Sequence, residues 1–478
     1  FWKRGVVVLV GACLIGLCIF GIRGRTGYNP IKVSAAYFCQ DAFLNQLGVS
    51  PTFNLLTSVM DDMRPENKYL HLMDEQEAIT KAQALLNRPG DANVSPLAVY
   101  RHAAKADSVQ QRRPNVVLIM MESMSSKLMK HFGQSETLTP FLDSLYTRSI
   151  SFRNFYSAGI HTNHGLYATL YSFPAMMKRN LMKGSVIPRY SGLPTVLKEN
   201  GYYNFFFMTH EGQYDNMNAF FRTNGYDEVF SQEDYPADKV VNSFGVQDDF
   251  LYDYAIPVLN QRAATGQPFF ATLLSISNHP PYVIPPFFHP KTSEPEMQIV
   301  EYADWALRQF FEEARKQPWF DNTIFVLEGD HGKLVGDAEC ELPESYNHIP
   351  LMIYSSRIHP EEKNTFGGQV DIQPTILGLL NIDYLQNNFG VDLLKEERPC
   401  MFYTADNMIV GRNDTLLYLY NYETQQEFTY HIDNGKLKAV PMDDRFLPLK
   451  EYSFSMLQSA EFLVKHGKTV NSVPFTQQ

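Results

Sequence analysis

The sequence predicts an α/β fold with a mostly parallel central sheet covered by helices on both faces. Short apolar runs alternate with helical patterns between residues 111 and 398, which is typical of a parallel sheet. Several of these runs end in an acid or a histidine, at the edge where open α/β sheets bind ligands. We expect this region to be a single catalytic domain, with an apolar helix before it in residues 1–28.

Residues 5–22 form an uncharged run of eighteen residues, most of them apolar. At about 1.5 Å per residue, a helix of that length spans roughly 27 Å, close to the thickness of the hydrocarbon core. A signal peptide is the alternative, but such cores are usually shorter, and residues 24–27 do not resemble a cleavage site. We therefore expect a transmembrane helix. Basic residues flank both ends, so charge does not fix its orientation.

Residues 29–110 are predicted to form a connecting arm without chemistry of its own. An amphipathic helix is expected at residues 74–87. Residues 88–96 carry Pro, Gly, Asp and Asn, which indicates a loop. Residues 41–60 show no clear period, so no element is predicted there.

The composition excludes two classes of function. The chain carries 41 Lys and Arg against 52 Asp and Glu, for a net charge of −11, and has no basic stripe that would bind nucleic acid. Of the five cysteines, two lie in the apolar N-terminus. The other three are scattered, which excludes a metal knuckle and a disulfide framework. Whether Cys340 and Cys400 form a single disulfide is left open.

Five buried strands are expected in the central region, separated by helical patterns. The strands are predicted at residues 115–121, 203–208, 268–276, 323–327 and 349–354. Helices are predicted at residues 139–147, 192–200 and 301–316. Residues 369–382 indicate a strand end that turns into a helix, and we expect a structural role for Asp371 within it.

Polar residues follow four of the expected strands. Because parallel strands share one carboxyl edge, these side chains are expected to gather there. They are Glu122, His210, His279, Asp330 and His331. A carboxylate beside an imidazole, as in the sequence EGDHG, is a natural ligand pair for Zn²⁺ or Mn²⁺. Acids and histidines are also common in loops, but their repetition after four strands favours a metal site with polar groups for an anionic substrate.

A nucleophile is expected at Thr162, in the sequence SAGIHTNHGLYATLY. A helix is predicted to start there, and a helix start favours anions through its dipole and free N–H groups. A hydroxyl close to a divalent cation loses its proton more readily and can attack phosphorus. The alternative is that Thr162 only caps the helix.

The last part of the chain, residues 399–478, is predicted to be a small antiparallel sheet with a closing helix. Alternating patterns at residues 401–405, 408–412, 416–422 and 427–432 indicate about four strands. The helix is expected at residues 452–465, and residues 467–478 are expected to be a loose tail. No catalytic grouping occurs in this part.

Six sequence segments in this order resemble the alkaline phosphatase/sulfatase superfamily, and most of all its lipoteichoic-acid synthase branch of membrane phosphoglycerol transferases. The segments are PNVVLIMMESM, NFYSAGIHTNHGLYATL, SISNHPPY, VLEGDHG, HIPLMIY and QVDIQPTILGLLNI. The resemblance implies that one divalent metal is bound by Glu122, Thr162, Asp330 and His331, with Mn²⁺ favoured and Zn²⁺ or Mg²⁺ as alternatives. It also implies that Thr162 is the nucleophile, with His279 and His210 in the substrate pocket.

The resemblance does not extend to the chemistry of true sulfatases, which mature a Cys or Ser followed by Pro two and Arg four residues later. Here His164 and Leu166 occupy those positions. A second departure concerns the Trp-Asn-Arg segment that holds glycerol phosphate in the transferases. The corresponding residues 214–218 lack the Arg, and Arg222 is a distant substitute. Phosphoethanolamine is therefore an alternative group, with Asp215 facing its ammonium.

Together these features predict a membrane-anchored, metal-dependent phosphotransferase with an extracytoplasmic catalytic domain. It is expected to move a phosphoglycerol-type group from a membrane phospholipid to a glycan or lipid acceptor through a phospho-threonine. A phosphodiesterase or phosphatase with nearly the same residues is the first alternative. A non-catalytic receptor on an enzyme scaffold is the second, which the complete set of candidate ligands disfavours.

Overall fold

The computed structural model describes residues 2–26, 29–39, 41–64, 67–86, 100–103, 113–184, 187–433 and 435–471. The loop expected at residues 88–96 lies outside these ranges, as do residues 472–478 of the expected tail. The division of the chain at residues 28, 110 and 398 into four parts stays a prediction.

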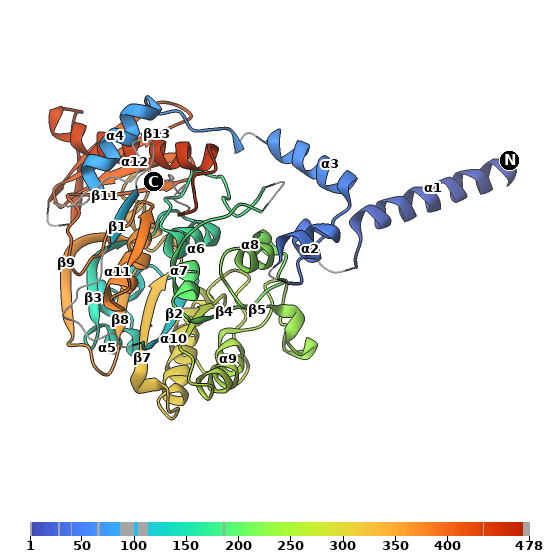
Figure 1. The fold of residues 1–478 in the computed structure, drawn as a ribbon, viewed down its shortest axis with the longest axis horizontal. Helices are drawn as coiled ribbons and strands as arrows, with labels where there is room; N and C mark the ends of the chain where they lie inside the picture. The colour runs from blue at the N-terminus through green and yellow to red at the C-terminus, as the bar shows by residue number, and fades with distance from the viewer. Residues whose placement is uncertain are drawn as a thin grey trace, which may run out of the picture.

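An eight-stranded sheet forms the centre of the molecule, with the strand order β5-β4-β6-β2-β7-β8-β3-β9 (Figure 1). Its strands are β2 (Asn115–Met121), β3 (Ile150–Tyr156), β4 (Tyr203–Met208), β5 (Glu228–Phe230), β6 (Phe269–Leu274), β7 (Thr323–Gly329), β8 (Leu351–Tyr354) and β9 (Glu361–Gly368). Neighbouring strands are parallel except where β8 pairs with β7 and β3. The predicted α/β fold with a mostly parallel sheet is confirmed.

Side chains of the central strand β2 enter two separate cores, one on each face of the sheet. Val116 and Leu118 lie in the core that includes α6 (Thr162–Tyr171), α7 (Leu193–Glu199), α8 (Met217–Thr223) and α11 (Ile372–Leu379). Val117 and Ile119 lie in the core that includes α5 (Pro140–Tyr146), α9 (Asp248–Ala263) and α10 (Pro295–Ala314). Because both faces of β2 are buried, nearly all its residues are apolar.

All five expected strands are present, but β3, β5 and β9 were not predicted. Strand β9 is polar and exposed over its first half, because it is an edge strand of the sheet. Strand β5 has three residues, too few for a pattern. Strand β3 contains the exposed Arg153, which interrupts its apolar side. The predicted helices at residues 139–147, 192–200 and 301–316 correspond to α5, α7 and α10.

The C-terminal part forms a separate antiparallel sheet of five strands rather than about four. These are β11 (Met401–Ala405), β12 (Met408–Arg412), β13 (Leu416–Asn421), β14 (Glu427–Asp433) and β15 (Lys436–Ala439). Strand β15 was missed because its sequence KLKA is short and mostly exposed, as suits an edge strand. The closing helix α12 (Leu447–Lys465) begins five residues earlier than expected and packs against α4 (Glu75–Leu86).

A buried ion pair joins α11 to the chain that leads into this second sheet. The guanidinium of Arg398 donates to both carboxylate oxygens of Asp371, and also to the hydroxyl of Tyr452 and the carbonyl of Phe389. Both charged side chains are at most 1% exposed. The backbone N–H groups of Gly368 and Val391 also donate to Asp371. These contacts support the structural role expected for Asp371.

Replacing Arg398 by methionine is expected to lower the free energy of unfolding by about 3–5 kcal/mol, because the Asp371 carboxylate would remain buried without its partner. Chemical denaturation of the full chain measures this change. The matched control is Arg445→Met, since the ion pair of Arg445 with Asp443 lies in solvent and should contribute little. Equal denaturation midpoints for both variants and the parent would contradict the expectation.

The N-terminal part contains α1 (Trp2–Arg23), which projects away from the compact domain (Figure 1). Among the described residues, α1 is the one helix long and apolar enough to cross a membrane, with a mean hydropathy of 2.8. It is followed by a 3₁₀ turn at Val33–Ala36, by α2 (Ala42–Leu47) and by α3 (Pro51–Asp62). Strand β1 (Tyr100–Ala103) pairs with β10 (Tyr384–Asn387), so the arm also adds a strand to the catalytic region.

Hydrogen bonds tie the segment after α1 to the loop that follows β4. The guanidinium of Arg25 lies 2.8 Å from a carboxylate oxygen of Glu211, and Asn29 donates to the other oxygen at 3.1 Å. The backbone N–H of Lys32 donates to the side chain of Gln213, and Asn218 donates to the carbonyl of Tyr37. The residues next to the expected membrane helix therefore pack on a loop at the carboxyl edge of the sheet.

Candidate active site

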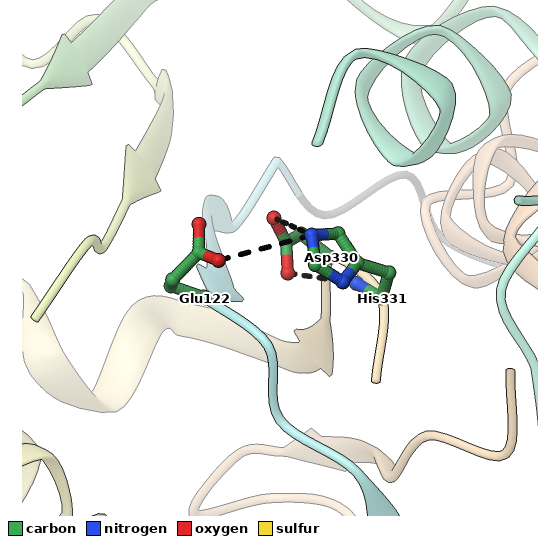
Figure 2. Close-up of side chains that lie close together, drawn as sticks. All are labelled: Glu122, Asp330 and His331. Carbon is green, nitrogen blue, oxygen red and sulfur yellow. Dashed lines mark hydrogen bonds and ion pairs between the residues drawn. The ribbon is translucent and has the colours of Figure 1, made fainter. Parts of the chain in front are cut away.

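Three of the predicted ligands converge at the carboxyl edge of the sheet. Glu122 follows β2, and Asp330 and His331 follow the neighbouring strand β7. One potential ligand atom from each residue lies within 4.8 Å of the others. Figure 2 shows the two carboxylates facing the imidazole, whose Nε2 lies 3.7 Å from Oε1 of Glu122 and 3.6 Å from Oδ2 of Asp330.

The hydrogen bonds around Asp330 and His331 leave lone pairs that could bind a metal on the side where these residues face each other. Oδ1 of Asp330 accepts from the backbone N–H groups of Ser123 and His331, at 2.8 and 2.7 Å. Its Oδ2 is buried and has no hydrogen-bond partner among the residues that the structure describes. Nδ1 of His331 lies 2.8 Å from the carbonyl of Gly332, so a proton on Nδ1 would leave the Nε2 lone pair free. This pattern fits a metal ligand set.

The electrostatics of Glu122 also fit a bound cation. Burial raises the pKa of this carboxyl well above its ordinary value, and the nearby Asp330 carboxylate raises it further. Two adjacent buried carboxylates repel each other, and a divalent cation between them would remove that repulsion. Glu122 and Asp330, with the imidazole of His331 and the hydroxyl of Thr162, would hold such an ion.

Thr162 is the first residue of α6, and its hydroxyl lies across from these carboxylates. Its Oγ1 donates to Oε2 of Glu122 at 3.5 Å, and the side chain is half-buried. The approach of α6 to β7 depends on Gly165, since a Cβ there would lie 2.3 Å from the carbonyl oxygen of Asp330. The glycine thus lets the start of the helix reach the carboxylates, where its N–H groups favour anions.

The predicted pocket residue Asp215 is joined to the start of α6. Its Oδ2 accepts from the amide of Asn163 at 3.2 Å, and its Oδ1 lies 3.0 Å from Nζ of Lys183. Burial acts to raise the pKa of Asp215, but Lys183, Asn163 and Lys32 together outweigh it, so the pKa lies below its ordinary value. The backbone of Asp215 has a φ of 46°, a conformation that is costly for most residues.

The two other predicted pocket residues lie in the loops at the same edge of the sheet. His210 is buried, its ring packs on Tyr214 with centroids 4.7 Å apart, and burial lowers its pKa. His279 is half-buried, its Nδ1 lies 2.6 Å from the carbonyl of Pro280, and its ring packs on Phe244. Within the described part of the chain, neither forms a hydrogen bond or ion pair with Glu122, Asp330 or His331.

Sequence reasoning missed a lysine beside the candidate metal ligands. Nζ of Lys333 donates to the side-chain oxygen of Asn278 at 2.8 Å. The amide of Asn278 in turn donates to the backbone carbonyls of Glu122 and Ser123. Burial lowers the pKa of Lys333 to about 8. The signal was present in the sequence, since Lys333 directly follows the GDHG segment and Asn278 lies within SNHP.

Comparison with known families adds an independent result. A family model described as Sulfatase matches residues 114–382. Lipoteichoic acid synthase 2 of Bacillus subtilis is 25% identical over 315 residues, which cover 59% of this chain and 47% of that protein. Lipoteichoic acid synthase of Staphylococcus saprophyticus is 24% identical over 369 residues, or 70% of this chain and 54% of that protein. The chain spans about half the length of these curated relatives.

Solved structures show the same fold. A protein of the alkaline phosphatase superfamily from Vibrio parahaemolyticus matches with a TM-score of 0.73 at 24% identity, over 84% of this chain and 98% of that one. A lipoteichoic acid synthase from Listeria monocytogenes matches with a TM-score of 0.64 at 21% identity, over 74% of this chain and 93% of that one. At these identities the likeness is one of fold.

Proposed function

The chain belongs to the sulfatase family, and from this premise we propose that it is a membrane-anchored phosphotransferase that uses Thr162 as its nucleophile. The observation that carries the proposal is the Thr162 hydroxyl at the start of α6, facing the carboxylate of Glu122. Sulfate-ester cleavage through a matured Cys or Ser is not proposed, because the chain has a threonine there, followed by His164 and Leu166.

In the proposed reaction, Oγ1 of Thr162 attacks the phosphorus of a phospholipid phosphodiester. The hydroxyl proton passes to solvent water, the bond from Oγ1 to phosphorus forms, and the bond from phosphorus to the diacylglycerol oxygen breaks. His279 supplies the proton that this leaving oxygen takes up. In the second step an acceptor hydroxyl gives its proton to His279 and bonds to phosphorus, the bond from phosphorus to Oγ1 breaks, and Oγ1 recovers a proton from water. The enzyme thus splits one transfer into two displacements.

The four candidate ligand residues are suited to Mn²⁺. Two carboxylates and a hydroxyl supply oxygen ligands, which Mn²⁺ and Mg²⁺ prefer, and the imidazole adds a nitrogen that also suits Zn²⁺. A bound divalent cation would supply positive charge that stabilises phosphoryl oxygens and a threonine alkoxide. Lys333, held by Asn278 beside Glu122, adds a second positive charge for the substrate phosphate.

The contacts of Asp215 favour phosphoglycerol over phosphoethanolamine as the transferred group. Both oxygens of this carboxylate are engaged, one by Lys183 and one by Asn163. Its charge is therefore already balanced by Lys183, which disfavours it as the group that binds the ammonium of ethanolamine. Lys183 places a cation in the region where the transferases that the sequence resembles carry an arginine, so it is proposed to contact the group's phosphate.

A phospholipid donor suits a chain with an apolar N-terminal helix, which we propose anchors it in the cell membrane with the catalytic domain extracytoplasmic. The acceptor is proposed to be an extracytoplasmic glycan or lipid. The names of the relatives, which are lipoteichoic acid synthases, support this class of acceptor and of donor. A hydrolase of the same superfamily would use the same residues with water as acceptor.

The test is to incubate the full chain and Mn²⁺ with vesicles that contain labelled phosphatidylglycerol or labelled phosphatidylethanolamine. We expect diacylglycerol from the first lipid and a glycerol-phosphate group on the peptide that contains Thr162, found by mass spectrometry. Transfer to an added glycolipid, rather than release of free glycerol phosphate, would distinguish a transferase from a hydrolase. No diacylglycerol from either lipid would contradict the proposed donor.

A further inference from the structure

The helix α3 carries its apolar side chains on the side that faces solvent. The exposed fractions are 64% for Leu55, 60% for Leu56, 49% for Val59, 65% for Met60 and 77% for Met63 just after the helix. Their spacing along the chain puts them on one side of the helix. A helix that packs on a protein core would bury this side and expose the other.

The opposite side of α3 is polar and is the more covered one. Asn54, Thr57, Ser58 and Asp61 are half-buried. The hydroxyl of Thr57 donates to backbone carbonyls of its own helix. The carboxylate of Asp61 pairs with Arg64 at 3.3 Å. The polarity of α3 is therefore reversed relative to a helix on the surface of a water-soluble domain.

The position of α3 links it to the apolar helix α1. The segment that joins α1 to α3 contacts the loop after β4 through Arg25 and Lys32. Within that segment, the side chain of Asn45 on α2 bonds to the backbone of residues 38 and 39. Figure 1 shows α2 near the base of α1, with α3 beyond it and outside the compact domain.

Apolar side chains are also exposed on α2 and just before it, and two basic residues follow α3. Leu47 on α2 and Phe38 before it are each 68% exposed. Arg64 and Lys68, which follow α3, are exposed. Arg64 is paired with Asp61, which leaves Lys68 as the cation beside the apolar face. This arrangement matches a membrane surface with anionic headgroups better than a protein partner, because the same segment leads directly into α1.

We propose that α3 lies flat in the interface of the membrane that α1 spans, with its apolar face among the acyl chains. This inference rests on the proposed anchoring by α1. The ligand is the surface of a bilayer with anionic phospholipids. Two attachments, one spanning and one flat, would restrict the tilt of the catalytic domain. The loop that carries Asp215 would then be held close to the headgroups.

The experiment compares Val59→Trp with Ser58→Trp in the full chain, reconstituted in phosphatidylglycerol-containing vesicles. The two positions are adjacent in sequence but lie on the apolar and the polar side of α3. Brominated acyl chains quench tryptophan on contact. We expect the fluorescence added at position 59, measured over the parent chain, to fall roughly twofold with brominated lipid, as for a side chain buried about 5–10 Å into the boundary. The fluorescence added at position 58 should not change.

Flotation of the vesicles, measured on the same samples, separates the two proposals. If the chain floats but position 59 is not quenched more than position 58, the docking of α3 is overturned while the anchor stands. If the parent chain does not float, both are overturned. Shielding of position 59 from aqueous iodide without quenching by brominated lipid would indicate a protein partner, such as a second copy, and would also overturn the inference.

Discussion

Replacing Thr162 by alanine is expected to abolish turnover and to leave the fold intact. The proposed reaction has no other group that forms the bond to phosphorus, and loss of the catalytic nucleophile in a serine protease lowers kcat by about 10⁶-fold. The side chain is half-buried and its hydroxyl makes one long hydrogen bond, at 3.5 Å, so the variant should unfold at the same temperature as the parent. Release of diacylglycerol from vesicles measures the turnover.

Two controls accompany this variant. Thr162→Ser keeps a hydroxyl at the same position and should retain measurable turnover and the trapped phosphorylated peptide. Asn163→Ala changes the neighbouring residue, whose amide bonds to Asp215, and should leave the nucleophile in place. Full activity of Thr162→Ala would remove the threonine from the mechanism. Activity lost together with a lower unfolding temperature would point to a structural role.

Replacing Asp330 by asparagine is expected to remove the bound metal. The asparagine oxygen can still accept the two backbone hydrogen bonds that Oδ1 accepts, so the turn after β7 should persist. The NH₂ group would replace Oδ2, the buried oxygen that accepts no hydrogen bond from the described residues. An NH₂ group cannot bind a cation. We expect the affinity for Mn²⁺ to fall by more than about 100-fold. This exceeds the effect of losing a side chain that only orients a metal ligand through a hydrogen bond.

Elemental analysis after dialysis, followed by titration with Mn²⁺, measures the change. Asp337→Asn is the matched control, since Asp337 is an exposed carboxylate in the loop after the same strand. It should keep the metal content of the parent. Equal metal content in the Asp330 variant and the parent would exclude Asp330 from the ligand set. Loss of metal from both variants would show that the loop as a whole, rather than Oδ2, determines binding.

The sequence was sufficient for the central strands because burial on both faces leaves a simple pattern. Strands β2 and β7 are apolar along almost their whole length, and parallel pairing brings Glu122, Asp330 and His331 to the same edge. Edge strands such as β9 and β15 escaped because their side chains face water. Their existence depends on a neighbour to pair with, which no local pattern reveals.

The pocket around the ligands was less predictable for a different reason. The pairing of Asp215 with Lys183, and of Lys333 with Asn278, joins loops that are distant in sequence. Such contacts depend on the conformation of the loops, which the local sequence pattern does not predict. The grouping of Glu122, Asp330 and His331 was accessible because each residue directly follows a strand. The closeness of Thr162 to these residues could be predicted only from the resemblance to a family. In the structure it depends on Gly165, which lets α6 approach β7.

The hydrogen bonds between the segment after α1 and the loop after β4 bear on how this enzyme can be studied. A soluble fragment cut before residue 113 would lack the partners of Glu211, Gln213 and Asn218. The loop, which carries Asp215, would then lose the hydrogen bonds that hold it in place. Kinetic constants from such a fragment would describe a loosened pocket. On the proposed function, the segment after α1 thus supports the substrate site as well as joining the catalytic domain to α1. Detergent-solubilised full chain is therefore the appropriate reference for activity.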